Sequence, residues 1–308
     1  MTGGEIKHFL SINNLSIGVI NSILDRADSF FPIGSKSVKK IPILRGKTIA
    51  NLFFEPSTRT KSSFQIALMN LGASFIDINP DTSSIVKGES VSDTIETLAL
   101  MGVNLFIIRH SEPIISDLAN QYPDLCFVNA GAGAESHPTQ ALTDLLTIKE
   151  FNREISQMNI SIIGHLDHSR VAKSFVELTK KLGCKTLRFS GLPELCTNFI
   201  DSDFGKFDPD MDSVIKDSDL VMGLRIQKER MQDTLSIDHA EYVSKYQLTK
   251  ERLKNAAENF LLFHPGPVNY GIEFNEEIAN LDNCKVSHQV ANGVGLRMAV
   301  LAKLFSEQ

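Results

Sequence analysis

Short apolar runs alternate with helical patterns along most of the chain. Residues 47–54 and 73–79 have the composition of buried strands, and residues 61–72 between them form a helical pattern that ends at Gly72, a suitable helix C-cap. Strands that alternate with helices predict βαβ units and parallel sheets. The further strands expected are 104–110, 124–131, 159–165, 185–191, 219–225 and 259–267, and the further helices expected are 90–102, 137–152, 169–183 and 293–308.

The length of the chain favours two domains. It has 308 residues, and a single hydrophobic core stops growing at roughly 250–300 residues. We therefore expect an α/β protein with two domains, each a parallel sheet flanked by helices, joined by helices near residues 137–152. The expected division is 1–148 plus 289–308 for one domain and 149–288 for the other.

Charge and cysteine content argue against nucleic-acid binding, a metal site and a disulfide framework. The net charge is −6 with no acidic or basic block, which argues against nucleic acid as a partner because binding to phosphate backbones needs a concentrated basic face. None of the four cysteines forms a C-x-x-C pair, so neither a metal site nor a disulfide framework is expected. No signal peptide and no apolar stretch of membrane-spanning length are evident, and we expect a cytoplasmic protein.

Polar clusters follow the predicted strands directly. Ligands of parallel α/β sheets bind beyond the carboxyl ends of the strands, so clusters at these ends predict one active site. The clusters are EPSTRT (55–60), RHSE (109–112), GHLDHSR (164–170), RIQKER (225–230) and HPGP (264–267).

The segment Ser57-Thr58-Arg59-Thr60 has the features of an anion site. It lies between a predicted strand and a predicted helix, where the first backbone N–H groups of a helix have no partner in the helix and attract an anion. The guanidinium of Arg59 adds a forked donor that matches phosphate oxygens. By itself the segment is also compatible with a plain capped helix that carries a solvated arginine. It is not a Walker A loop, since no G-x-x-x-x-G-K is present.

The wider motifs resemble those of the aspartate/ornithine carbamoyltransferase family. FFEPSTRT (53–60) matches the family signature F-x-[EK]-x-S-[GT]-R-T, and the resemblance covers essentially the whole chain. The other matching segments are 83–89, 107–112, 137–147, 169–171, 225–230, 264–269 and 292–301.

The resemblance implies a set of carbamoyl phosphate ligands. The domain formed by 1–148 plus 289–308 would bind this substrate, and the active site would be shared between the subunits of a homotrimer. A serine and a lysine of one subunit, here Ser83 and Lys87, would enter the neighbouring site, the lysine to contact aspartate. The remaining ligands implied are Ser57, Thr58, Arg59, Thr60, Arg109, His137, Gln140, Gly266 and Pro267.

The resemblance also implies the acceptor. Members that use aspartate bind it through residues matching Arg170, Arg225 and Gln227, whereas members that use ornithine carry an aspartate, an S-M-G motif and H-C-L-P. The H-P-G-P and R-I-Q-K-E-R motifs of this chain therefore favour aspartate as the acceptor. The alternatives are an ornithine-type enzyme and a non-catalytic homologue that scaffolds a partner such as dihydroorotase.

The implied reaction is carbamoyl transfer without a cofactor. The amino group of L-aspartate attacks carbamoyl phosphate, which gives N-carbamoyl-L-aspartate and phosphate for pyrimidine synthesis. Thr60, Arg109 and His137 would donate to the carbonyl oxygen, and Arg59 would be a further catalytic residue. The alternative role of His137 is that of a general base. Glu55 and Arg230 would serve domain closure. A regulatory chain is compatible with the sequence.

Several residues depart from the family pattern. His165 stands where many relatives have aspartate, Tyr270 replaces an arginine, Lys61 replaces another, and Ala132 and Ala134 lie in a loop that is usually G-D-G. None of them belongs to the implied ligand set. We interpret His165 and the nearby histidine at position 168 as solvated or hydrogen-bonded loop residues rather than metal ligands.

Overall fold

The computed structural model describes residues 5–30, 40–79, 83–227 and 238–305. The chain divides into two compact units, Met1–Leu146 with Val290–Gln308, and Thr147–Gln289. Two helices, α5 (Pro138–Glu150) and α11 (Val286–Phe305), contain residues of both units. Within the described residues, no helix is long and apolar enough to span a membrane.

The first unit contains a sheet of four parallel strands in the order β2-β1-β3-β4. Each strand lies within a segment predicted from the sequence or extends one residue past it. Because all the strands run in the same direction, their carboxyl ends meet at one edge of the sheet. The strands are β1 (Thr48–Phe53), β2 (Ser74–Ile78), β3 (Leu105–His110) and β4 (Cys126–Ala132).

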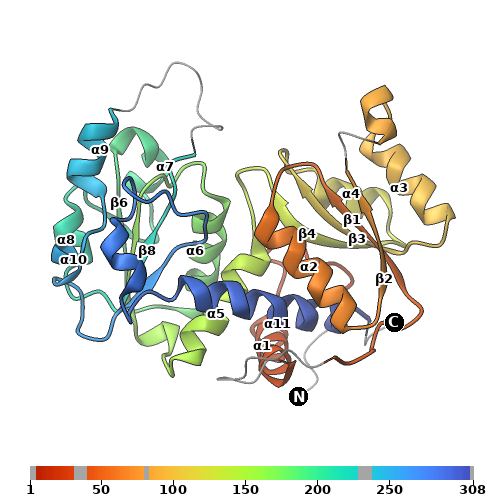
Figure 1. Ribbon diagram of the computed structural model, residues 1–308, viewed down its shortest axis with the longest axis horizontal. Helices are drawn as coiled ribbons and strands as arrows, with labels where there is room; N and C mark the ends of the chain where they lie inside the picture. Colours follow the sequence, from red (N-terminus) through yellow and green to blue (C-terminus); the bar gives the residue numbers. More distant parts are fainter. Residues whose placement is uncertain (1–4, 31–39, 80–82, 228–237, 306–308) are drawn as a thin grey trace. The chain divides into compact units, whose positions relative to one another are not determined.

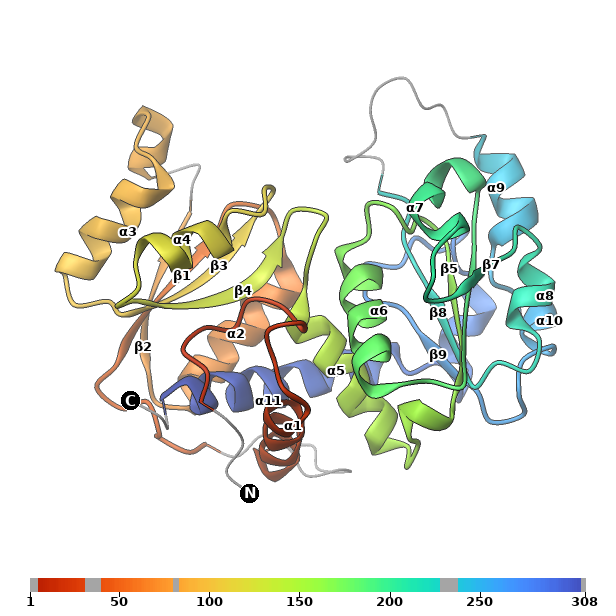
Figure 2. The same cartoon turned by 180° about the vertical axis from the view of Figure 1, so that it is seen from behind.

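Helices cover both faces of this sheet (Figures 1 and 2). Apolar residues of α3 and α4, such as Ile95 and Leu118, form a buried cluster with Leu52 and Phe106 of the strands. The helix α2 lies on the opposite face. The helical elements are α1 (Ile17–Phe30), α2 (Thr58–Asn70), the 3-10 turn η2 (Ser84–Lys87), α3 (Val91–Leu100) and α4 (Ile115–Gln121).

Helix α2 begins earlier than its apolar pattern predicts. The pattern starts at residue 61, but the helix starts at Thr58, with Ser57 as its extended N-cap residue. Polar residues thus form the first turn, where no apolar side chain is needed. At the other end the C-cap is Leu71 and not Gly72 as predicted; Gly72 follows it with φ +75°, which glycine adopts readily, and the Ala73 N–H donates to the Leu68 carbonyl at 3.0 Å.

The second unit contains five parallel strands in the order β7-β6-β5-β8-β9. The predicted α/β architecture of two parallel sheets is therefore confirmed. The strands are β5 (Asn159–Ile163), β6 (Thr186–Ser190), β7 (Lys206–Phe207), β8 (Leu220–Gly223) and β9 (Leu261–Phe263). The helical elements are η3 (Ile155–Gln157), α6 (Arg170–Leu182), η4 (Pro193–Leu195), α7 (Thr197–Ile200), α8 (Met211–Ile215), α9 (His239–Tyr246), α10 (Lys250–Leu253) and η6 (Glu276–Asn280).

The start of α11 is the largest error in the predicted boundaries. The apolar pattern starts at residue 293, whereas the helix starts at Val286. Its first turns are polar because their side chains bind other elements of the second unit. His288 Nδ1 lies 2.9 Å from Glu150 Oε1, and Gln289 Oε1 accepts a hydrogen bond from the His264 N–H at 3.0 Å. A helix packed through polar contacts gives no hydrophobic period in its sequence.

Candidate active site

The anion segment 57–60 lies at the carboxyl edge of the first sheet. Strand β1 ends at Phe53, and α2 starts at Thr58. The side chain of Ser57 forms no capping hydrogen bond, while Thr58 and Arg59 are exposed. The first-turn N–H groups therefore have no side-chain cap from Ser57, and an anion at this helix start would be stabilised by these donors and by the helix dipole.

Arg109 is held beside this segment by Glu55. It lies near the end of β3, and its Nε is 3.2 Å from Glu55 Oε2, with both side chains less than one-fifth exposed. A second guanidinium nitrogen, Nη1, donates to the Ala130 carbonyl at 3.5 Å. These two contacts fix the plane of the guanidinium, which leaves it oriented for forked contacts to an oxyanion.

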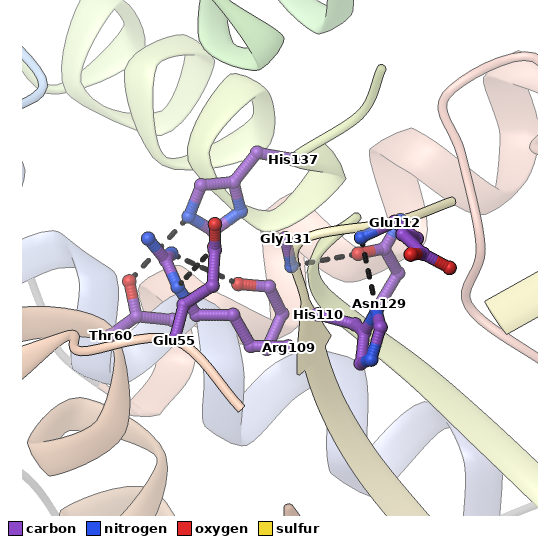
Figure 3. Close-up of polar contacts among 9 residues, drawn as sticks. Glu55, Thr60, Arg109, His110, Glu112, Asn129, Gly131 and His137 are labelled. Carbon is purple, nitrogen blue, oxygen red and sulfur yellow. Dashed lines mark hydrogen bonds and ion pairs between the residues drawn. The ribbon is translucent and has the colours of Figure 1, made fainter. Parts of the chain in front are cut away.

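Thr60 and His137 lie next to each other beside Arg109 (Figure 3). Thr60 Oγ1 lies 3.5 Å from His137 Nε2, and both residues are buried. On the other side of the ring, His137 Nδ1 lies 3.5 Å from Thr139 Oγ1. Figure 3 shows Thr60, Arg109 and His137 together, with Glu55 against the arginine. Three of the predicted catalytic side chains are thus brought together by β3, α2 and the start of α5.

Gln140 points its amide nitrogen to a buried carboxylate. Its Nε2 donates to Asp144 Oδ1 at 2.8 Å, one turn along α5. Burial lowers the pKa of Arg297 to about 10, and the negative charge of Asp144 opposes this shift. Arg297 donates to the Gly293 carbonyl at 2.9 Å and lies over the ring of Phe64. A buried polar network in the first unit therefore supports the predicted ligand Gln140.

The sequence interpretation did not include Asp144 and Arg297 in the site. The available signal was a charged residue inside the apolar pattern of the last helix, because arginine is rarely fully buried without a partner. Asp144, whose negative charge acts on Arg297, lies more than 150 positions earlier in the chain, and no local pattern identifies it.

Ser83 and Lys87 lie in the connection between β2 and α3. The Ser83 carbonyl accepts from the Val86 N–H at 3.2 Å at the start of η2, and Lys87 is exposed at the end of that turn. Residues 80–82 of this connection lie outside the described residues. The assignment of Ser83 and Lys87 to a neighbouring site stays a prediction.

The second unit positions Arg170 and the segment 225–227. Arg170 is buried in the first turn of α6, whose N-cap Ser169 accepts from the Ala172 N–H at 3.2 Å. Arg225 and Gln227 follow the end of β8. Gly164 lies against this segment: it has φ +126°, and a Cβ there would lie 2.6 Å from the Leu224 carbonyl oxygen, so only glycine fits. Arg230 lies outside the described residues.

The predicted turn residues Gly266 and Pro267 follow β9 and are joined by a cis peptide bond. The Gly266 N–H donates to His264 Nδ1 at 2.9 Å. Just beyond the turn, the Asn269 N–H donates to Glu273 Oε2 at 2.9 Å. Glu273 was not among the predicted site residues.

His165 and His168 form a hydrogen-bonded pair, and His165 is buried rather than solvated. His165 Nε2 lies 2.8 Å from His168 Nδ1, and His165 Nδ1 accepts from the Gln227 N–H at 3.3 Å. Since His165 Nδ1 is an acceptor, its Nε2 carries the hydrogen and donates to His168. Both nitrogens of His165 are thus occupied by protein contacts. Within the described residues, no group of three or more potential metal ligands occurs.

Comparison with protein families decides the assignment. The model described as the aspartate/ornithine carbamoyltransferase carbamoyl-P binding domain matches residues 7–150, and the Asp/Orn binding domain model matches residues 156–304. The chain belongs to the aspartate/ornithine carbamoyltransferase family. The family predicted from the motifs is confirmed.

Solved structures similar to this carbamoyltransferase-family chain include aspartate transcarbamoylase from Trypanosoma cruzi. Its complex with carbamoyl phosphate is 27% identical with a TM-score of 0.87, over 97% of this chain and 96% of that one. Its complex with carbamoyl phosphate and aspartate is 27% identical with a TM-score of 0.85, over 97% of each chain. Its complex with N-(phosphonacetyl)-L-aspartic acid is 26% identical with a TM-score of 0.84, over 97% of this chain and 95% of that one.

Proposed function

We propose that this chain is an aspartate carbamoyltransferase, which transfers the carbamoyl group of carbamoyl phosphate to the amino group of L-aspartate. The supporting observation is the cluster of Thr60, Arg109 and His137 in a chain that matches, over its length, a T. cruzi aspartate transcarbamoylase with carbamoyl phosphate and aspartate bound. The product N-carbamoyl-L-aspartate would enter pyrimidine synthesis.

The reaction needs no nucleophile from the protein. The aspartate nitrogen forms a bond to the carbamoyl carbon, the bond from that carbon to the phosphate oxygen breaks, and the departing phosphate takes the amine proton. Thr60, Arg109 and His137 donate to the carbonyl oxygen as its negative charge develops. His137 acts as a donor in this proposal, since its two ring nitrogens face threonine hydroxyls, which accept as well as donate.

The arginines of the proposed site match the negative charges of both substrates. Carbamoyl phosphate is a dianion and would be held in the first unit by the segment 57–60, with Arg109 and Gln140. Aspartate brings two carboxylates, which Arg170 and Arg225 of the second unit would bind with forked hydrogen bonds. The turn at Gly266 and Pro267 would offer backbone groups to carbamoyl phosphate, and Glu55 with Arg230 would hold the two domains closed.

Product analysis tests this function. Purified protein with carbamoyl phosphate and L-aspartate should form N-carbamoyl-L-aspartate and inorganic phosphate in equal amounts, and His137→Asn should lower the rate strongly. Phosphate release without carbamoyl-aspartate would contradict the proposal. If His137→Asn kept a near-normal rate and an unchanged pH profile, both the donor and the general-base roles of His137 would be wrong.

The active protein is proposed to be a cytoplasmic homotrimer in which Ser83 and Lys87 of each subunit complete the neighbouring site. Two inactive variants, Arg109→Met and Lys87→Ala, should then regain activity when they are dissociated and reassembled together, because some mixed trimers contain one site with neither substitution. The matched control is a mixture of Arg109→Met with a third variant, Gln140→Ala. Each subunit supplies both Arg109 and Gln140 to its own site, so every site in this mixture carries one of the two substitutions and no activity should return. Recovery in neither mixture, or a monomeric active protein by light scattering, would contradict the shared site.

A further inference from the structure

The segment Arg225–Gln227, called the acceptor segment below, has few backbone partners in its sheet. Strand β8 ends at Gly223, and the next N–H, that of Leu224, donates to the Ile163 carbonyl at 2.8 Å. After Leu224, the described backbone up to residue 227 no longer pairs with the neighbouring strands of the sheet. Backbone N–H groups in a buried place need acceptors, so other groups must bind those of the acceptor segment.

Two buried side chains from different loops supply these acceptors. Glu273 Oε1 accepts from the Ile226 N–H at 3.0 Å, and His165 Nδ1 accepts from the Gln227 N–H at 3.3 Å. Glu273 is 2% exposed and His165 is 0% exposed. Two consecutive residues of the acceptor segment are thus held from two sides, by the loop after β5 and by the loop after β9.

The Glu273 carboxylate also holds the loop that carries the Gly266–Pro267 turn. Its Oε2 accepts from the Asn269 N–H at 2.9 Å, and its Oε1 accepts from Asn269 Nδ2 at 2.9 Å. Burial raises the pKa of Glu273, and the N–H donors of Ile226 and Asn269 oppose this rise because they favour the ionised form. One carboxylate therefore links two loops that carry expected substrate contacts.

We propose that Glu273 is a positioning residue that fixes the backbone of the acceptor segment and thereby sets the affinity for the acceptor amino acid, with His165 as the second support. This inference rests on the proposed function, because Arg225 and Gln227 matter only if they bind aspartate. Glu273 itself contacts no substrate in this proposal, since its oxygens are occupied by the acceptor segment and Asn269. The carboxylate acts indirectly, because it fixes the position of the backbone that carries Arg225 and Gln227.

Steady-state kinetics of Glu273→Gln test the proposal. The amide keeps the shape of the carboxylate, but its NH2 group is a donor and cannot accept from both loops, so a buried N–H is left without an acceptor. We expect the KM for aspartate to rise about tenfold or more, as the loss of one buried acceptor predicts. The kcat at saturating aspartate and the KM for carbamoyl phosphate should stay within about threefold of the unsubstituted values.

Glu241→Gln is the matched control. Glu241 lies on α9 of the same unit and its side chain pairs with Lys245 at 2.7 Å on the surface. It should leave both KM values and kcat unchanged. Circular dichroism and thermal unfolding show whether each variant is folded.

The second support provides an independent test. His165→Leu removes the acceptor for the Gln227 N–H, whereas the side-chain oxygen of His165→Asn lies where Nδ1 lies in histidine and keeps an acceptor. We expect His165→Leu to raise the KM for aspartate about tenfold and His165→Asn to keep it within about threefold. These two variants decide the proposal if Glu273→Gln does not fold.

The outcomes separate this inference from the proposed function. An active unsubstituted protein whose aspartate KM is the same in Glu273→Gln would overturn this inference alone. Equal effects of His165→Leu and His165→Asn would also overturn it, because they indicate a packing role. If the unsubstituted protein forms no carbamoyl-aspartate, the proposed function fails and this inference fails with it.

Discussion

The anion site of the first unit and the acceptor segment of the second are built in different ways. In the first unit most of the proposed site is local, because the segment 57–60 lies between β1 and α2, and Arg109, His137 and Gln140 are added from β3 and the start of α5. In the second unit the acceptor segment depends on Glu273 and His165, which come from two distant loops. The first site follows from a short motif, while the second depends on tertiary contacts.

This difference suits the two ligands. A phosphate is recognised by the N–H groups and dipole of one helix start, which any chain with the right local sequence can form. An amino acid with two carboxylates needs guanidinium groups at fixed positions, because forked hydrogen bonds depend strongly on orientation. Buried side-chain acceptors provide that fixed backbone.

The largest expected effect is that of Arg109→Met on turnover. If Arg109 donates to the carbonyl oxygen, the substitution should lower kcat by about 10²–10³-fold, as the loss of an oxyanion donor does. Steady-state rates of carbamoyl-aspartate formation measure the change. Arg153→Met is the control, since Arg153 forms an ion pair with Asp219 at 2.9 Å in the second unit and should leave kcat unchanged. A kcat within about threefold for Arg109→Met would refute the assignment.

Arg297→Met should have its main effect on the stability of the first unit. The guanidinium is fully buried near Asp144, so its removal leaves a buried carboxylate without its neighbouring positive charge. The loss of a buried guanidinium that donates to the Gly293 carbonyl and packs on the ring of Phe64 should lower the free energy of unfolding by about 1–3 kcal/mol. Urea unfolding measures this loss, and the double substitution Asp144→Leu/Arg297→Met should recover part of it. Equal stability of the single variant and the unsubstituted protein would contradict this role of Arg297.

Glu55→Gln tests whether Glu55 acts only on Arg109 or also on aspartate binding. The substitution removes the charge that holds Arg109 Nε at 3.2 Å, and a hydrogen bond to a charged group contributes enough for an effect of about tenfold on kcat. If Glu55 also holds the two domains together, the KM for aspartate should rise as well. A change in kcat alone would limit Glu55 to the first unit, and unaltered aspartate affinity and turnover would exclude both roles.

Thiol labelling should give the smallest effect. Burial raises the pKa of Cys126 and of Cys196 to about 12, while Cys184 and Cys284 are only half-buried. At pH 8 the two half-buried thiols should react first, which peptide mapping by mass spectrometry can follow. Carbamoyl phosphate should slow the labelling of Cys126 in the first unit more than that of Cys196 in the second. Equal protection of both thiols would contradict the assignment of this ligand to the first unit.

The sequence predicts most of the fold because parallel strands are buried on both faces and appear as short apolar runs. It predicts the anion segment because a helix start is a local structure. The first turns of α11 were not predicted, since polar contacts such as that of Gln289 with the His264 N–H replace the apolar pattern there. Glu273 was not predicted for a related reason: a buried carboxylate is recognised only from the N–H groups that surround it.

The preference of the protein for its acceptor amino acid is measured by the ratio of kcat/KM for L-aspartate to kcat/KM for L-ornithine. With carbamoyl phosphate saturating, we expect a ratio well above about 10², because the proposed contacts of Arg170 and Arg225 would favour two carboxylates and disfavour a side-chain ammonium group. A ratio below one, with citrulline as the main product, would contradict it.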